Sequence, residues 1–281
     1  TSPRTIRNIQ EQFGFTFKKG LGQNFLTARN ILEEIVDAAE IESGVIEVGP
    51  GFGVLTSELA QNSDKVVTIE IDERLIDVLD YTLAEYDNVK IINEDILKLD
   101  LTKVIDDEFN GEKVSIAANL PYYITTPIIT KLLEEKLPIK NIVVMVQKEV
   151  AERMSAKPST KDYGAITVLC QYYTEPSIVA NVPASLFVPP PKVDSAVLKL
   201  KVLDKPSVEV KDEGVFFRVV KAAFSQRRKT LLNCLSANFP IPKDEISTLL
   251  ESIGVAPSRR GETLSLEEFA NIADTLLQKI K

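Results

Sequence analysis

The sequence predicts an α/β protein in which helices cover both faces of a mostly parallel sheet, followed by a small α-helical domain. From residue 30 to about 150, short apolar strands alternate with segments whose apolar residues recur at helical spacing. Strands separated by helices pair in parallel through right-handed crossovers. Beyond Lys205-Pro206 only helical patterns follow. We therefore expect a first domain of residues 1–204 and a second of residues 205–281.

The elements of the first domain follow one another in a regular order. The predicted strands are Val45–Val48, Lys65–Ile71, Val89–Ile92, Val114–Ala118 and Ile142–Val146, and the predicted helices are Asn30–Ala39, Thr56–Ala60, Leu75–Leu83 and Pro127–Leu133. The first helix carries an apolar stripe of Ile31, Leu32, Ile35 and Val36. The proline run in residues 187–191 predicts a stiff extended loop. Residues 193–202 then alternate as in an edge strand that closes the sheet.

The second domain reads as short helices. We expect them over Val215–Leu235, Lys243–Ser252 and Leu266–Ile280. Ser265 and Glu268 have the spacing of a capping box, in which each side chain bonds the backbone N–H of the other residue at a helix start. The last helix should therefore begin at this pair.

Composition and charge limit the possible functions. The formal net charge is −8, but residues 33–110 alone hold 21 acidic against 5 basic residues. Basic clusters remain elsewhere, at Lys18-Lys19, Arg227-Arg228-Lys229 and Arg259-Arg260. Phosphate binding depends on local positive potential, since distant charges are screened. The net charge therefore does not exclude an RNA partner, although each cluster taken singly is equally well explained as a solvated helix face.

Some classes of chemistry are excluded by residue counts. The chain has no His and only two cysteines, which are far apart in sequence. A zinc site or a His-based catalytic triad is therefore not expected, and we predict that no metal takes part. No apolar stretch reaches the length of a membrane span and the start does not resemble a secretory signal, so we expect a cytoplasmic protein.

A cofactor pocket is predicted at successive strand ends. Residues 47–53 (EVGPGFG) follow a strand and precede a helix, and glycines there allow a sharp turn and a close approach of the backbone to a ligand. Glu70 ends the next strand, where an acid accepts hydrogen bonds from ribose hydroxyls, and Asp95 follows the third. Singly, each acid reads as a surface carboxylate. Their ordered occurrence in one alternating unit favours a nucleotide-like cofactor.

The tetrapeptide Asn119-Leu120-Pro121-Tyr122 follows the fourth strand. An amide oxygen and a backbone carbonyl fixed by the proline could accept the N–H bonds of a flat exocyclic amine, and Tyr122 could stack on its ring. This arrangement would favour a pyramidal, nucleophilic nitrogen. For the tetrapeptide alone, a plain turn after a buried strand is the simpler interpretation.

Several blocks together carry a family resemblance. They are residues 22–26 (GQNFL), 47–53, 119–122 with 124–127 (ITTP), 147–150 (QKEV), 163–164 (YG), 187–196 (FVPPPKVDSA) and 226–231 (QRRKTL). With them the chain resembles the KsgA-type ribosomal RNA adenine N6,N6-dimethyltransferases, which use S-adenosylmethionine. The resemblance implies a Rossmann-like methyltransferase sheet.

The resemblance also implies roles for matching residues. Asn24 and Leu26 would contact the cofactor, Gly49 and Gly51 would line its methionine part, Glu70 would hold its ribose and Asp95 its adenine. Asn119 would lie between cofactor and target amine, with Leu120 and Pro121 shaping the turn. Tyr122 and Phe187 would sandwich the flipped base, although without the family Phe187 reads as a core anchor. The clusters containing Lys18, Lys19, Arg227, Arg228, Lys229, Arg259 and Arg260 would contact RNA.

The expected reaction is transfer of methyl groups to N6 of two adjacent adenosines in the 3′-terminal hairpin loop of 16S rRNA, leaving S-adenosylhomocysteine. We expect a monomer that acts on the small ribosomal subunit late in its biogenesis. Two alternatives stay open. One is a large-subunit rRNA dimethyltransferase of the macrolide-resistance type, and the other is an assembly factor whose binding matters more than its methylation.

Overall fold

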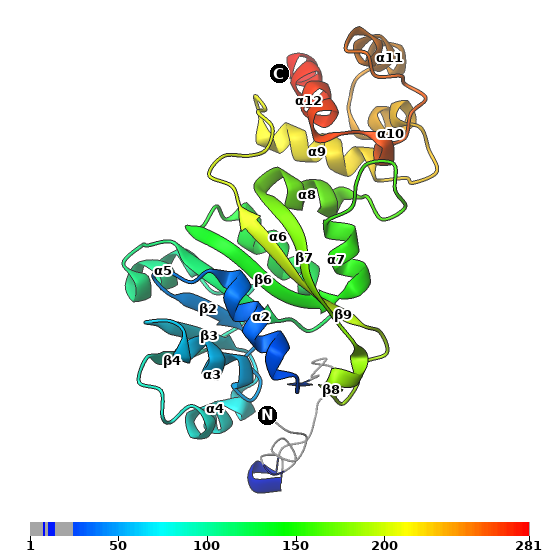
Figure 1. The fold of residues 1–281 in the computed structure, drawn as a ribbon. Helices are drawn as coiled ribbons and strands as arrows, with labels where there is room; N and C mark the ends of the chain where they lie inside the picture. Colours follow the sequence, from blue (N-terminus) through cyan, green and yellow to red (C-terminus); the bar gives the residue numbers. More distant parts are fainter. Residues whose placement is uncertain (1–7, 9–10, 15–24, 281) are drawn as a thin grey trace. The chain divides into compact units, whose positions relative to one another are not determined.

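The computed structural model describes residues 8, 11–14 and 25–280. The predictions for Lys18, Lys19 and Asn24 concern residues outside this part of the chain. The chain forms two compact units (Figure 1). Unit 1 consists of Thr1–Ala151 and Glu175–Val202, and unit 2 consists of Glu152–Thr174 and Leu203–Lys281. The separate roles expected of residues 1–204 and 205–281 stay predictions.

Unit 1 contains a seven-stranded sheet with the strand order β4-β3-β2-β5-β6-β9-β7. The strands are β2 (Val45–Val48), β3 (Val66–Glu70), β4 (Val89–Asn93), β5 (Val114–Asn119), β6 (Ile139–Gln147), β7 (Thr174–Val182) and β9 (Ser195–Val202). The pairs β2–β3, β2–β5, β3–β4 and β5–β6 are parallel. Every residue of β2 and β3 is buried, as expected for parallel strands covered on both faces. The predicted α/β class is confirmed.

Helices alternate with these strands. They are α2 (Arg29–Ala39), α3 (Val54–Gln61), α4 (Ile76–Thr82) after the 3-10 turn η2 (Glu73–Leu75), α5 (Leu101–Phe109), α6 (Thr125–Glu134) and α7 (Lys148–Met154). Helices α2, α3, α4 and α6 correspond to the four predicted helices, whereas α5 and α7 were not predicted. The stripe predicted for α2 is buried, and with α3 it packs on β5 and β6 residues such as Ala117 and Val143. β8 (Phe187–Val188), which follows the 3-10 turn η3 (Ala184–Leu186), forms a short antiparallel pair with β1 (Phe25–Leu26).

One strand prediction was wrong. The segment predicted as an edge strand is β9, which lies between β6 and β7 inside the sheet and pairs with β6 in antiparallel register. Its first four residues are all buried, which an edge strand with one exposed face would not show. The edge strand beyond β9 is β7, which was not predicted from the sequence. Its residues are mostly exposed or half-buried and include Pro176, so no clear alternation marks it.

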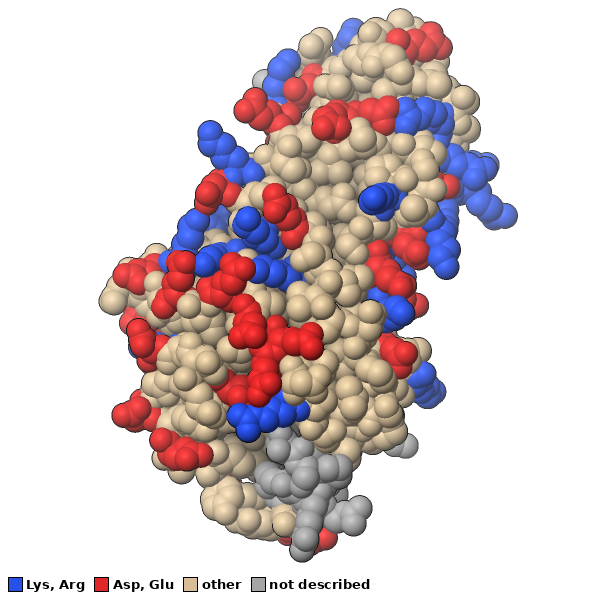
Figure 2. Space-filling model, viewed as in Figure 1, with Lys and Arg blue, Asp and Glu red and all other residues tan. Residues whose placement is uncertain are grey.

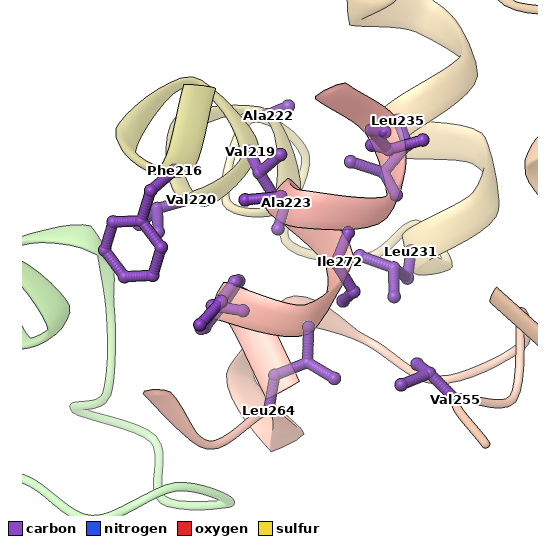
Figure 3. Packing of buried hydrophobic residues seen from close by; sticks show 14 of the residues in the cluster. Phe216, Val219, Val220, Ala222, Ala223, Leu231, Leu235, Val255, Leu264 and Ile272 are labelled. Carbon is purple, nitrogen blue, oxygen red and sulfur yellow. The ribbon is translucent and has the colours of Figure 1, made fainter. Parts of the chain in front are cut away.

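Unit 2 is helical. It contains α8 (Ala165–Tyr173), α9 (Glu213–Ala223), α10 (Leu231–Asn238), α11 (Lys243–Ser252), the 3-10 turn η4 (Gly261–Thr263) and α12 (Leu266–Ile280). Side chains from α9, α10 and α12 meet in one apolar core, as Figure 3 shows for Phe216, Val219, Leu235 and Ile272. Within the described residues, no helix combines the length and the apolar character needed to cross a membrane.

The single helix predicted over residues 215–235 was also wrong, because the structure has two helices there. α9 ends at Ala223, and α10 begins at Leu231 with Thr230 as its N-cap, whose hydroxyl accepts the Asn233 N–H at 3.4 Å. Thr followed by an apolar run is an N-terminal helix signal that would have divided the segment. The cluster Arg227-Arg228-Lys229 therefore lies in the turn between helices and not on a helix face.

Candidate active site

The candidate site is a pocket at the carboxyl ends of parallel strands. β2 lies between β3, which follows it in sequence, and β5, so the strand order reverses direction between β2 and β5. Ligand sites in open α/β sheets form at such a switch point. The residues predicted from sequence that line this pocket are Leu26, Gly49, Gly51, Glu70, Asp95, Asn119, Leu120, Pro121 and Tyr122. The fold thus brings together residues that are nearly a hundred positions apart.

The loop between β2 and α3 supplies the glycines. Gly49, Gly51 and Gly53 have φ of 70°, 59° and 79°, a region that other residues rarely adopt. The Gly49 N–H donates to the Ile69 carbonyl at 2.9 Å, which ties the loop to β3. A Cβ atom on Gly49 would meet no atom within 4 Å, whereas one on Gly53 would come within 3.0 Å of the Leu83 side chain. Gly49 therefore borders open space, and Gly53 serves helix packing.

Glu70 is held rigidly in the pocket wall. Its carboxylate oxygens accept the Asp72 N–H at 2.8 Å and the Gly51 N–H at 3.4 Å, so they link the end of β3 to the glycine loop. Only 5% of the residue is exposed, and this burial raises the pKa of Glu70 above its usual value, while the two N–H bonds oppose the rise. A carboxylate offers about four acceptor positions, so further hydrogen bonds from a ligand can be accommodated.

Asp95 follows β4 and is only partly buried. One carboxylate oxygen accepts the Leu97 N–H at 2.9 Å, and the other lies 3.9 Å from the Lys98 ammonium. The N–H bond fixes the orientation of the side chain at the start of the turn. Asp95 is thus a second oriented acceptor in the same pocket as Glu70.

The Asn119–Tyr122 turn forms another wall. Asn119 ends β5 and pairs with Met145 of β6, and the Leu120 N–H donates to the Met145 carbonyl at 3.2 Å. The Pro121 carbonyl accepts the Ile124 N–H and the Thr125 hydroxyl, both at 3.2 Å, which joins the turn to α6. These contacts make the turn a fixed part of the sheet edge.

Tyr122 is half-buried, and its hydroxyl shares a hydrogen bond of 2.9 Å with that of Ser195 at the start of β9. Burial raises the pKa of the Tyr122 hydroxyl, and the nearby Asp194 adds to the rise. The ring is therefore neutral and anchored at its polar end, as a stacking surface requires.

Phe187 does not line the pocket. It is 3% exposed, packs in the core cluster of α2 and the sheet, and pairs with Leu26 across β1 and β8. The structure thus matches the core-anchor interpretation more directly, and the role of Phe187 in holding a base stays a prediction.

The basic residues predicted to contact RNA differ in their exposure and in their hydrogen bonds within the chain. Arg228 and Lys229 are exposed in the turn between α9 and α10, and Arg227 donates to the Lys161 carbonyl at 2.9 Å. Arg259 instead bonds Glu268 and the Thr263 carbonyl, so its guanidinium helps hold the start of α12. Figure 2 shows basic side chains near α10, and acidic ones gathered around α2 of unit 1.

Some pocket residues were not predicted as site residues. Glu47 on β2 is 1% exposed and accepts a 2.6 Å hydrogen bond from the Thr56 hydroxyl, and burial raises its pKa to about 7. Ile71 and Tyr123 line the pocket while 54% and 58% exposed. Their positions directly after Glu70 and Tyr122 are the sequence signal that could have identified them.

The pocket is also distinctive in charge. Its lining includes four acidic residues, Glu47, Glu70, Glu94 and Asp95, and no Lys or Arg among the described residues. A ligand rich in phosphate would be repelled, whereas one with a positive charge would be favoured. In the described part of the chain, no group of three or more acidic or cysteine side chains is arranged to hold a metal ion.

Comparisons with known proteins agree with this architecture. The chain is 54% identical over 282 residues to the ribosomal RNA small subunit methyltransferase A of Bacillus mycoides (strain KBAB4), covering 98% of this chain and 97% of that protein. The protein of the same name from Bacillus anthracis (strain CDC 684) gives the same values.

Solved structures are similar over nearly the whole length. A dimethyladenosine transferase from Plasmodium falciparum has a TM-score of 0.76 and 30% identity, covering 91% of this chain and 98% of that one. The 23S rRNA methyltransferase ErmE has a TM-score of 0.68 and 28% identity, covering 90% and 100%. The sequence profile described as "Ribosomal RNA adenine dimethylase" matches residues 14–278. The chain therefore belongs to the ribosomal RNA adenine dimethylase family.

Proposed function

We propose that this protein transfers methyl groups from S-adenosylmethionine to N6 of two adjacent adenosines in the 3′-terminal hairpin loop of 16S rRNA, within the small ribosomal subunit. The observation that carries the proposal is the full-length identity of 54% to proteins named ribosomal RNA small subunit methyltransferase A. The turn at Asn119, placed in a pocket with oriented acids, supplies the matching chemistry.

The pocket fits an adenosyl cofactor that carries a positive charge. Glu70 and Asp95 present oriented acceptors for ribose hydroxyls and an adenine amine, and Gly49 leaves open space where any other residue would place a Cβ atom. Four acids without a lining base suit a sulfonium and not a dinucleotide phosphate. When bound, S-adenosylmethionine supplies an electrophilic methyl group. Leu26 lines the same pocket and would contact the cofactor from the N-terminal side.

The Asn119 turn would bind and orient the target amine. The Pro121 carbonyl already accepts two hydrogen bonds, so we assign the two acceptors for the amine to the Asn119 side-chain oxygen and the Leu120 carbonyl. Bonds to both N–H groups orient the nitrogen lone pair toward the methyl donor, so catalysis is mainly positioning. The amine proton leaves to water or to a carbonyl oxygen, because methylation makes the nitrogen acidic. No imidazole is required.

The remaining parts of the proposal concern the partner. Arg228 and Lys229 would contact rRNA phosphates, with Arg227 braced on the Lys161 carbonyl. Lys18, Lys19 and Asn24 keep their proposed roles in RNA and cofactor binding, although they lie outside the described residues. We propose that the protein acts as a monomer in the cytoplasm, where small subunits mature.

The large-subunit alternative is less well supported. The solved 23S rRNA methyltransferase shares 28% identity with this chain, well below the 54% of the small-subunit proteins. An assembly role through binding is compatible with methylation and needs no separate site.

The decisive experiment offers unmethylated small and large subunits to the protein with labelled S-adenosylmethionine, then maps the modified bases. We expect label at N6 of two adjacent adenosines near the 3′ end of 16S rRNA and none in 23S rRNA. Label in 23S rRNA would reverse the assignment of substrate, and absence of label in both would refute the proposed activity.

A further inference from the structure

Tyr123 is an aromatic residue at the pocket that the reaction outlined above does not use. It lines the pocket and remains 58% exposed. Tyr122, the preceding residue, is half-buried with its hydroxyl held by Ser195. The two neighbouring tyrosines are therefore in different environments, one fixed in the wall and one at the mouth.

A second exposed apolar side chain lies at the same pocket. Ile71, the residue after Glu70, is 54% exposed and lines it from the end of β3. Single exposed apolar residues are common and need no explanation. Here two such residues follow separate strands and line one pocket.

Tyr81 is an exposed tyrosine that does not line the pocket, and it can be compared with Tyr123. It is also 58% exposed, but it is not among the residues that line the pocket and its ring packs edge-on against Phe13 with 5.5 Å between centroids. Tyr81 thus already has an aromatic partner within the chain. It provides a control with the same residue type and the same exposure.

We propose that Tyr123 is a stacking platform for the nucleobase next to the target adenosine. The inference rests on the proposed function, in which one base of an adjacent pair is extruded into the pocket. Extrusion breaks the stack between that base and its neighbour, and an aromatic side chain restores stacking for the base left outside. Tyr123 is thus a positioning residue for RNA.

The test compares Tyr123→Ala, Tyr123→Phe and Tyr81→Ala in methylation of unmethylated small subunits at saturating S-adenosylmethionine. Loss of one stacked base weakens binding by roughly tenfold. We expect Tyr123→Ala to raise KM for the subunit by about this factor, with kcat at saturating subunit and cofactor affinity close to wild type. Tyr123→Phe should restore the wild-type KM, because the ring alone provides the stacking. Tyr81→Ala should leave all three quantities unchanged.

Three results would overturn the inference. They are an unchanged KM in Tyr123→Ala, a fall in kcat without a rise in KM, or an equal effect of Tyr81→Ala. Failure of the proposed function is distinguishable, since the wild-type protein would then leave both adenosines unmodified. In that event the dissociation constant for a short single-stranded RNA containing adjacent adenosines tests Tyr123 directly. Weaker binding by Tyr123→Ala alone supports the platform, and equal binding by both alanine variants rejects it.

Discussion

At the residue scale, Glu47 is a carboxyl group in the pocket whose surroundings disfavour its ionised form. It lies on the buried strand β2, bonded to the Thr56 hydroxyl at 2.6 Å. Burial is the main cause that raises its pKa to about 7, and the nearby Glu70 carboxylate adds to it. A cationic ligand in the same pocket would favour the ionised form, so cofactor binding and the protonation of Glu47 are coupled.

This pKa predicts a pH-dependent stability in the protein without cofactor. Between pH 4.5 and about 7, the folded state retains a proton that the unfolded chain has released, so the contribution of Glu47 is complete below pH 4.5 and is lost as pH rises through 7. The shift corresponds to about 3 kcal/mol. We expect Glu47→Gln to reduce the loss of unfolding free energy between pH 5 and pH 8, measured by urea denaturation. Glu112→Gln, at an exposed position, is the control, and equal slopes for both variants would contradict the prediction.

Asn119 is the residue on which catalysis should depend most. It ends β5 in a turn held by backbone bonds to β6 and α6, so removing its side chain should leave the fold intact. We expect Asn119→Ala to lower kcat by 10²-fold or more, by analogy with the loss of one oriented polar group at a reacting centre. Binding to the small subunit, measured as a dissociation constant, should change little. Near-normal dimethylation would exclude the assigned role.

At the element scale, the start of α12 shows local sequence determining structure. The predicted capping box is confirmed, because the Glu268 N–H donates to the Ser265 hydroxyl at 3.2 Å and the Ser265 N–H donates to the Glu268 carboxylate at 2.9 Å. Arg259 bonds the same carboxylate and lowers the pKa of Glu268, with the Ser265 bond acting in the same direction. The spacing of Ser265 and Glu268 predicted the cap but not the bond from Arg259, which precedes η4 in the sequence.

The cap leads to a prediction on stability. Replacing an N-cap serine with alanine typically costs about 1 kcal/mol. We expect Ser265→Ala to lower the free energy of opening of the first turn of α12 by this amount, measured by hydrogen exchange of its amides. Ser247→Ala, inside α11, is the control and should be neutral or slightly stabilising, since alanine has the higher helix propensity. An equal effect of both changes would show that the cap contributes nothing.

Several of the elements that sequence analysis located correctly bury a continuous apolar face, although α5, which also does so, was not predicted. β2 and β5 are buried along their length, and α2 carries its stripe at helical spacing, so pattern alone identified them. β7 was not predicted, because it forms by pairing in the sheet and has no apolar run of its own that would mark it in the sequence. The division between α9 and α10 depends on a single capping threonine inside a helical pattern.

The candidate site divides in the same way. Gly49, Glu70, Asp95 and Asn119 could be found because each lies at or just after the end of a recognisable strand, and parallel strands bring their carboxyl ends together. For Phe187 the sequence left two interpretations open, a core anchor and a stacking partner, and the pairing of β8 with β1 accompanies the burial that the first one expects. The position of Tyr123 directly after Tyr122 could have placed it at the pocket, but its exposure is a property of the folded turn.

At the scale of the whole molecule, charge is divided along the chain. Residues 33–110, which hold 21 acidic and 5 basic residues, all lie in unit 1, while the exposed cluster of Arg228 and Lys229 lies in unit 2. The acids near α2 are partly neutralised by ion pairs such as Glu40 with Lys199 at 2.6 Å. Long-range repulsion from unit 1 is screened at physiological salt, so local cations decide where phosphate binds.

This separation predicts a specific salt dependence. Each phosphate contact contributes roughly 0.7 to 0.9 to the slope of log affinity against log salt. The double variant Arg228→Ala/Lys229→Ala should therefore reduce the slope for small-subunit binding by between about one and two, while leaving cofactor affinity unchanged. Lys103→Ala/Lys243→Ala removes the same charge from two separate exposed positions and is the control. If both double variants lowered the slope equally, the effect would come from net charge, and the turn between α9 and α10 would have no specific part in RNA binding.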